Sequence, residues 1–246
     1  MKVLLINPNS NGNMTLSLRE LVEKFKTDYI DVTVVGMTDT PDFVGSQDTI
    51  DKTFDSVKKT ILESKNNYDL FILACHLDPN LERLRKDTKQ TILGIGECSL
   101  LFSKMLGKTF SIIGSSEKTV NLKRDMTERY GALDMLDYIG YPDEDSSGDL
   151  VDKLADASGK AIKEYDSDAI VLGCAGFVDY DSYIEKKIGK EVIDGVVISL
   201  IIADGYAKYK SYKTKWSNVK DLSFLASLLL LICYRIIFLF FQRLKL

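Results

Sequence analysis

The 246-residue sequence contains a single histidine, His76, and this scarcity limits the chemistry available to the chain. A site that needs two imidazoles, such as the H-E-x-x-H zinc motif, is excluded. A Ser-His-Asp triad would have to use His76. The glycines form no G-x-G-x-x-G fingerprint, so dinucleotide binding is not indicated.

An excess of basic charge is also lacking, since 32 Lys and Arg residues stand against 36 Asp and Glu residues. We therefore expect no nucleic-acid partner. The four cysteines form no C-x-x-C pair and have no zinc-ribbon spacing. The N-terminus lacks the apolar region and cleavage site of a signal peptide. We expect a cytoplasmic chain with reduced thiols. These cysteines are Cys75, Cys98, Cys174 and Cys233.

A long hydrophobic run, LSFLASLLLLICYRIIFLFF, occupies residues 222–241 and carries one charge, Arg235. A bilayer span needs about 20 apolar residues, so this appended hydrophobic helix is a possible membrane anchor. The lysines that precede it would then place the main domain in the cytoplasm. A buried or interfacial helix and a non-native extension are the alternatives.

Upstream of this run, short apolar segments alternate with stretches of helical periodicity. Near-continuous apolar strands that alternate with helices indicate a parallel sheet covered on both faces, hence an α/β fold. The predicted strands are 3–6, 31–36, 70–74, 91–93, 109–113, 168–173 and 191–193. The predicted helices are 15–26, 48–66, 80–87, 98–106, one after the GSSEK turn, one that ends near 165, and 195–209.

Two pairs of similar segments indicate an internal repeat. YDLFILACHLDPN matches SDAIVLGCAGFVD, and KVLLINPNS matches TFSIIGSSE. We therefore expect two similar doubly wound lobes with parallel sheets, namely residues 1–97, completed by a helix over 195–216, and residues 98–194. Because ligands bind at the carboxyl ends of parallel strands, we expect the active site in the cleft between the lobes.

Cys75 and Cys174 occupy equivalent places in this repeat, each at the end of a hydrophobic strand and before a predicted helix. The positive end of a helix dipole lowers a thiol pKa and favours the thiolate. A lone cysteine is often simply packed in a core. A matched pair instead suits one base and one acid on opposite faces of a substrate carbon. Such a racemase needs neither a metal nor a cofactor if an adjacent carbonyl delocalises the carbanion.

Several short motifs occur in a characteristic order: INPNS followed by MT, AC followed by DP, GIGE, GCAGF and VIDGV. Together they resemble the hydantoin/allantoin racemase group of the aspartate/glutamate racemase superfamily, over about residues 2–216. The resemblance implies a two-lobed α/β fold and cofactor-independent inversion of C5 in 5-substituted hydantoins or allantoin. It implies a small cyclic imide as substrate and a homo-oligomeric enzyme, and it assigns catalysis to Cys75 and Cys174.

The residues beside the cysteines distinguish branches of this superfamily. Amino-acid racemases of this type resemble C-N-T and C-T-E at these places, whereas this chain has His76-Leu77 and Ala175-Gly176. Small residues and backbone N–H groups suit a neutral imide, so we expect turn amides to donate to its ring carbonyls. The substrate-binding candidates are turn and loop residues at the expected cleft: Asn9, Ser10, Phe43, His76, Ser115, Ser116, Ala175 and Gly176.

Other interpretations remain open at this stage. The chain could be an amino-acid racemase of the Asp/Glu type, a related decarboxylase that returns a proton from one cysteine, or a non-catalytic, membrane-tethered binding protein. Cys98 is expected to be a packing residue. Asp78, Asp179 and Asp194 precede helices, and we expect each to cap one.

Overall fold

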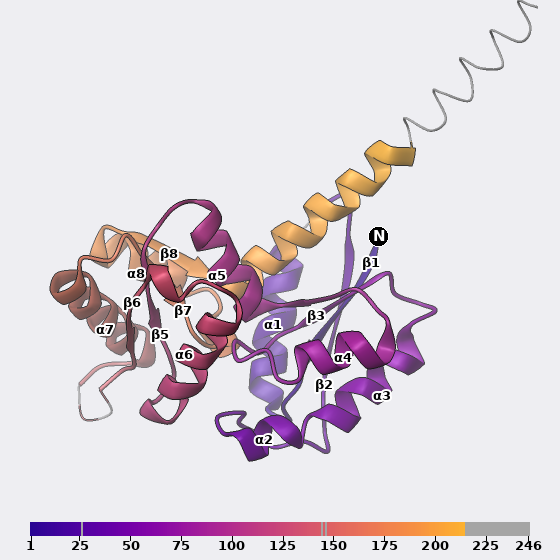
Figure 1. Ribbon diagram of the computed structural model, residues 1–246, viewed down its shortest axis with the longest axis horizontal. Coiled ribbons are helices and arrows are strands. Elements are labelled where there is room, and N and C mark those ends of the chain that lie inside the picture. Colours follow the sequence, from indigo (N-terminus) through magenta and orange to yellow (C-terminus); the bar gives the residue numbers. More distant parts are fainter. Residues whose placement is uncertain (26, 144, 146, 215–246) are drawn as a thin grey trace, which may run out of the picture. The chain divides into compact units, whose positions relative to one another are not determined.

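The computed structural model describes residues 1–25, 27–143, 145 and 147–214 (Figure 1). The hydrophobic run at 222–241 lies outside these residues. In the described part of the chain, no helix combines the length and apolar composition that a bilayer crossing requires.

Two four-stranded parallel sheets form the framework of residues 1–204. The first has the order β2-β1-β3-β4 and is built from β1 (Lys2–Asn7), β2 (Asp31–Gly36), β3 (Leu70–Leu73) and β4 (Ile92–Gly94). The second has the order β6-β5-β7-β8 and is built from β5 (Phe110–Ile113), β6 (Leu136–Gly140), β7 (Ala169–Leu172) and β8 (Glu191–Asp194). The two orders are equivalent, which confirms the predicted α/β fold of two similar lobes.

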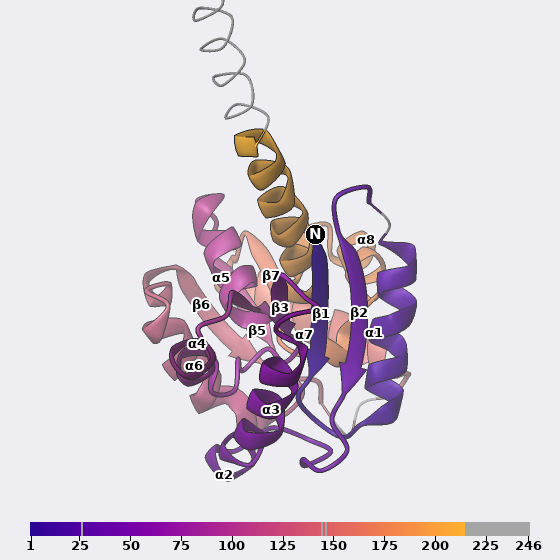
Figure 2. The ribbon, with the colours of Figure 1, turned by 90° about the vertical axis from the view of Figure 1, so that its right-hand side faces the viewer.

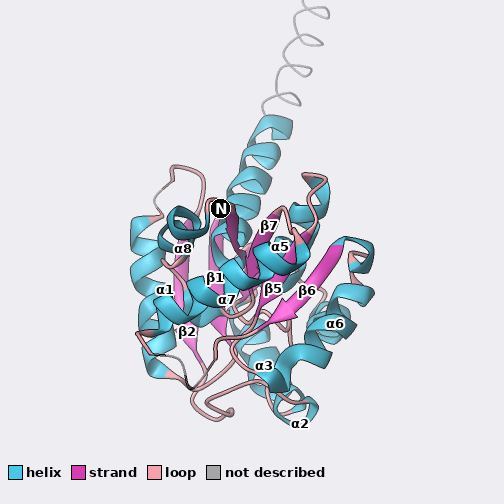
Figure 3. Ribbon diagram, turned by 90° about the vertical axis from the view of Figure 1, so that its left-hand side faces the viewer, coloured by secondary structure: helices cyan, strands magenta, loops and turns pink. Residues whose placement is uncertain are grey.

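Helices flank both sheets (Figure 3). They are α1 (Gly12–Lys24), α2 (Gln47–Asp51), α3 (Phe54–Ser64), α4 (Leu81–Thr88), α5 (Ile95–Met105), α6 (Val120–Arg129), α7 (Leu150–Tyr165) and α8 (Asp181–Ile188). Short 3-10 turns are η1 (Glu117–Thr119), η2 (Leu133–Met135) and η3 (Ala175–Phe177). Helix α1 packs against β2 (Figure 2), and α7 covers β5 and β6.

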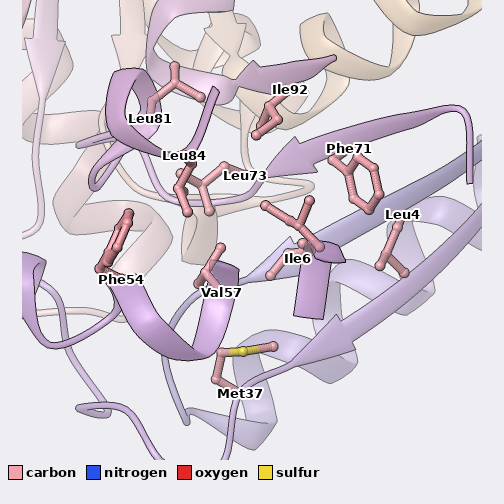
Figure 4. Packing of buried hydrophobic residues seen from close by; sticks show 11 residues of the cluster. Leu4, Ile6, Met37, Phe54, Val57, Phe71, Leu73, Leu81, Leu84 and Ile92 are labelled. Atoms are coloured by element: carbon pink, nitrogen blue, oxygen red, sulfur yellow. The ribbon is translucent and has the colours of Figure 1, made fainter. Parts of the chain in front are cut away.

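The core of the first lobe shows why its strands are continuously apolar. Leu4 and Ile6 of β1 point into a cluster formed with β3, β4, α3 and α4 (Figure 4). Their neighbours Val3 and Leu5 are also fully buried, on the opposite face because side chains alternate along a strand. A strand buried on both faces needs apolar residues at every position.

Two local predictions were wrong. The helix expected over 48–66 is interrupted between α2 and α3, where the Thr53 hydroxyl and the Asn80 side chain both donate to the Ile50 carbonyl, at 2.8 and 2.7 Å. These bonds end α2 by taking over a carbonyl at its C-terminus. Strand β6 was not predicted, because it is an edge strand whose first residues are partly exposed, so it has no apolar run.

The chain after β8 is helical from residue 195, and Asp194 begins this helix by accepting the Val196 N–H at 2.7 Å. The predicted cap is therefore confirmed. Farther along, the Thr27 hydroxyl of the first lobe donates to Asp204 at 2.6 Å. We therefore propose that residues 195–204 complete the first lobe. Residues 205–214, which belong to a separate unit, continue as helix.

Candidate active site

Cys75 and Cys174 lie just beyond the carboxyl ends of β3 and β7, the third strands of their lobes in chain order. Both line one pocket, although they come from different lobes. Its other walls come from the turn after β1, the loop before α2, the turn after β5 and helix α6. The lining residues are Asn9, Met14, Phe43, Val44, Ala74, Cys75, His76, Leu77, Ser115, Thr119, Lys123, Gly173, Cys174 and Ala175.

The pocket collects most of the residues singled out in the sequence. Ser10, Ser116 and Gly176 are the three expected residues that do not line it. Ser116 instead lines a separate cavity of the second lobe, beside Tyr138. The expected residues that do line it are Asn9, Phe43, Cys75, His76, Ser115, Cys174 and Ala175.

Three of the turn amides expected to bind ring carbonyls donate hydrogen bonds within the protein. The N–H of Asn9 donates to the Asn7 side chain at 3.3 Å. The N–H of Ser10 donates to the Pro41 carbonyl at 3.1 Å. The N–H of Gly176 donates to the sulfur of Cys174 at 3.4 Å. These three amides hold the turns and one sulfur in place in the structure.

The two thiols share one electrostatic environment. Burial raises the pKa of Cys75 to about 12, against the lowering effects of the Leu77 N–H and the Lys123 charge. Burial likewise raises the pKa of Cys174, opposed by the Gly176 N–H and again by Lys123. In the absence of substrate, both cysteines are therefore neutral thiols near pH 7.

The expected lowering of these pKa values by helix dipoles is wrong. Helix α4 begins at Leu81 and helix α8 at Asp181, well beyond Cys75 and Cys174. The effect of a helix dipole falls off within the first turn. Only the single 3-10 turn η3 follows Cys174 directly. Burial therefore has a larger effect on the pKa values of the two thiols than the weak field of the nearby helix termini.

His76 follows Cys75 in the first cysteine-bearing turn and is buried. Its Nε2 lies 3.3 Å from the Ser99 hydroxyl and its Nδ1 lies 3.5 Å from the Lys123 ammonium. Burial, assisted by the Lys123 charge, holds the pKa of His76 well below its usual range. The imidazole is therefore neutral and serves as a hydrogen-bonding wall of the pocket.

Lys123 is a charged lining residue that sequence reasoning missed. It lies in α6, whose many charged residues are typical of a solvent-exposed helix. A usable signal existed, because Lys123 shares a helix face with Met126 and Thr127, at the i+3 and i+4 spacing of a buried stripe. All three side chains are buried. Because α6 is rich in charged residues, the burial of Lys123 was not predicted.

Asp78 also caps a helix other than the expected one. It accepts the N–H groups of Gly96 and Glu97 at 3.1 and 2.6 Å, at the start of α5, and the Tyr130 hydroxyl at 2.8 Å. The residue at the N-cap of α4, which follows Asp78 in the chain, is Asn80. Asp78 therefore links the first cysteine turn to α5 and, through Tyr130, to the end of α6.

The remaining sequence expectations concern packing, helix capping and metal binding. Cys98 is buried in the apolar core of the second lobe, as predicted. Asp179 forms an ion pair with Lys24, and no capping bond from it was found at α8. Among the described residues, no group of three or more His, Cys, Asp or Glu side chains is placed to hold a metal ion.

Fold and site together define a class: an α/β protein of two like lobes, each of which contributes one cysteine to a common pocket. Residues 3–200 match the model of the Asp/Glu/Hydantoin racemase family, and the chain belongs to this family. The family indicated by the sequence motifs is thereby confirmed. Racemases are isomerases, so the chain belongs to a family of isomerases.

Named relatives agree with this assignment. The hydantoin racemase of Paenarthrobacter aurescens is 28% identical over 227 residues, which cover 89% of this chain and 95% of that protein. The solved allantoin racemase from Klebsiella pneumoniae has a TM-score of 0.78 at 22% identity, covering 85% of this chain and 89% of its own. The allantoin racemase from Pseudomonas fluorescens has a TM-score of 0.77 at 19% identity, covering 85% and 92%. The two structures share the fold of this chain.

Proposed function

We propose that this protein is a cofactor-independent racemase that inverts C5 of 5-substituted hydantoins or of allantoin. One observation carries the proposal: Cys75 and Cys174, from equivalent strand ends of two lobes, line the same pocket. Relatives named hydantoin racemase and allantoin racemase support the substrate class.

In the proposed reaction, one of the two resting thiols first loses its proton to water, and the resulting thiolate takes the C5 proton from one face of the ring. The electron pair left on C5 delocalises into the adjacent ring carbonyl as an enolate. The other sulfur, a thiol, then delivers its proton to the opposite face. The thiolate and thiol have now exchanged places, so the same pair converts the opposite enantiomer in the reverse direction.

The pocket is narrow, with a cavity volume of about 30 Å³, which is room for little more than a water molecule. The proposal therefore requires the pocket walls to move apart when the ring enters. We propose that the side-chain amide of Asn9 and the hydroxyl of Ser115 bind the ring carbonyls in place of the backbone amides of Asn9, Ser10 and Gly176, which are engaged within the protein. The Asn9 Oδ1 accepts the Asn11 N–H at 3.0 Å, and among the described residues its Nδ2 donates only to the weak acceptor Met14 Sδ, at 3.4 Å. That geometry leaves the Asn9 NH₂ available as a donor.

The remaining assigned residues form the walls. His76 and Ala175 line the pocket beside the two cysteines. Phe43 is 41% exposed at the pocket and can cover an entering ring with its apolar face. We assign no substrate contact to Ser10, Ser116 or Gly176.

Polarimetry of single enantiomers tests the proposal. The optical signal of L- and D-5-substituted hydantoins or of allantoin should decay, whereas that of aspartate and glutamate should persist. Cys75→Ser and Cys174→Ser should each lose at least about 100-fold in rate, the usual contribution of a general acid or base. Cys98→Ala is the matched control, because Cys98 lies in the core and outside the pocket.

The outcomes separate the alternatives. Decay with aspartate or glutamate but not with the imides would assign the pocket to amino acids. A folded protein that racemises none of these compounds would overturn the proposal, and retained turnover in either serine variant would overturn the two-thiol mechanism.

We also infer a cytoplasmic site of action and a homo-oligomeric state. The first rests on the chemistry, because a mechanism with free thiols needs a reducing compartment, and the three described cysteines are free. The second is supported by apolar side chains that stay exposed on helices, such as Leu101, Met105 and Ile201. Light scattering after size-exclusion chromatography tests the oligomeric state, and a monomer would contradict it.

A further inference from the structure

Lys123 is a lysine in an unusual place, because its side chain is only 1% exposed. A buried charge is costly unless other groups compensate it. The ammonium donates to the Gly173 carbonyl at 2.6 Å and approaches the His76 Nδ1 at 3.5 Å. Gly173 precedes Cys174 and His76 follows Cys75, so this one ammonium joins the two cysteine-bearing turns.

The directions of the hydrogen bonds are fixed by Ser99. Its hydroxyl donates to the Gly96 carbonyl at 3.0 Å, so it accepts from the Nε2–H of His76. The neutral imidazole then carries a lone pair on Nδ1, which accepts from Lys123. An ammonium has three N–H donors, and these contacts use two. No described residue accepts the third, and Lys123 lines the pocket.

The backbone beside Lys123 is shaped to admit its long side chain. At Gly114, which follows β5, an added Cβ would come within 2.7 Å of the Lys123 Cε. The absence of a side chain at this position therefore leaves the path along which the lysine reaches the pocket.

The charges around Lys123 identify its partners. Cys174, Cys75 and Asp78 are the titratable groups whose negative charge would stabilise the ammonium, and the neighbouring His76 is neutral. Asp78 is held by α5 and Tyr130 and makes no direct bond to Lys123. Burial lowers the pKa of Lys123 to about 8, so it still carries its charge near pH 7.

We propose that Lys123 is a positioning residue that supplies the counter-charge for the catalytic thiolate, whether this forms on Cys75 or on Cys174. This inference rests on the proposed two-thiol function. Each turnover moves the thiolate from one sulfur to the other, while Lys123 keeps its three protons and its place between the two turns. One thiolate and one ammonium leave the pocket neutral overall, which suits an uncharged imide.

Thiol alkylation in the absence of substrate tests the inference. Wild-type protein and the variants Lys123→Met and Lys123→Gln are treated with iodoacetamide between pH 6 and 9, and the labelling of each cysteine is read by mass spectrometry. Gln can still hydrogen-bond to Gly173 and His76 but has no charge. Lys118→Met is the matched control, because Lys118 is exposed and lies just before α6.

We expect both Lys123 variants to be alkylated at least about tenfold more slowly at Cys75 and at Cys174, since one pKa unit is a factor of ten in thiolate. Lys118→Met should match the wild type. If Lys123→Met does not fold, Lys123→Gln carries the test alone. Folded Lys123→Gln with wild-type alkylation profiles would overturn the inference and assign Lys123 a purely structural role.

This result is independent of the substrate assay. If the Lys123 variants are alkylated more slowly but the wild type racemises no imide, the inference about Lys123 holds and the proposed function is rejected. If the wild type racemises an imide but the Lys123 variants are alkylated at the wild-type rate, the proposed function holds and the inference about Lys123 is rejected.

Discussion

The glycine before the second cysteine offers a sharp test of how the fold positions the site. Gly173 packs directly on β5 and donates its N–H to the Ile113 carbonyl at 2.8 Å. A Cβ added at Gly173 would lie 2.8 Å from the Ile113 carbonyl oxygen and 3.0 Å from the Gly114 Cα. Both are backbone atoms, so neither can swing aside as the end of a flexible side chain can.

The size of the effect follows from these distances. Carbon atoms in contact prefer separations of about 3.5 Å or more, so Gly173→Ala must shift the backbone by about 0.5 Å. Overpacking of this kind costs about 1–3 kcal/mol of stability. Because a displacement of 1 Å can cost about 100-fold in rate, the same shift at Cys174 should slow racemisation by about tenfold or more.

Urea unfolding and polarimetry measure the two effects in one preparation. Gly12→Ala is the matched control, since no atom lies within 4 Å of a Cβ added there and Gly12 begins α1. That variant should keep its activity and be as stable as the wild type or up to about 1 kcal/mol more stable. Wild-type stability and rate in Gly173→Ala would refute the reasoning.

Two further predictions concern stability. Burial raises the pKa of Asp78 from 3.8 to about 7, so its stabilising contribution is full below pH 4 and is lost as the pH rises to 7, by at most about 4 kcal/mol. Urea unfolding from pH 4 to 8 should therefore show a steeper decline for the wild type than for Asp78→Asn, and equal slopes would contradict this sign. Leu84→Ala removes a fully buried side chain from the core of the first lobe and should cost about 2–5 kcal/mol. Leu16→Ala, at a position 54% exposed, should change stability by less than about 0.5 kcal/mol in the same measurement.

Much of the fold could be predicted from local pattern. Strands such as β3 and β7 are buried on both faces, and their continuous apolar runs identified them. The edge strand β6 lacks such a run, because its outer residues face solvent, and it was missed. The break between α2 and α3 depends on a bond from Asn80, which is distant in sequence, so helical periodicity could not reveal it.

The residues of the candidate site could likewise be predicted only in part. Cys75 and Cys174 were found because the repeat places them at equivalent strand ends. Lys123 was missed because a lysine in a charged helix is ordinarily solvated, and its burial depends on packing against the turns of both lobes. The protonation state of the thiols was also misjudged, since it depends on burial and on that lysine.

By itself, the sequence determined the two-lobed α/β fold, the family and the pair of equivalent cysteines, because these follow from hydrophobic patterns and repeated motifs along the chain. Only the tertiary structure decided which turn amides are already bonded, where Asp78 acts as a cap, and that a buried ammonium joins the two cysteine turns. Those features arise from contacts between segments far apart in sequence. The burial that these contacts produce sets the protonation states of the buried side chains, and no local sequence pattern encodes it.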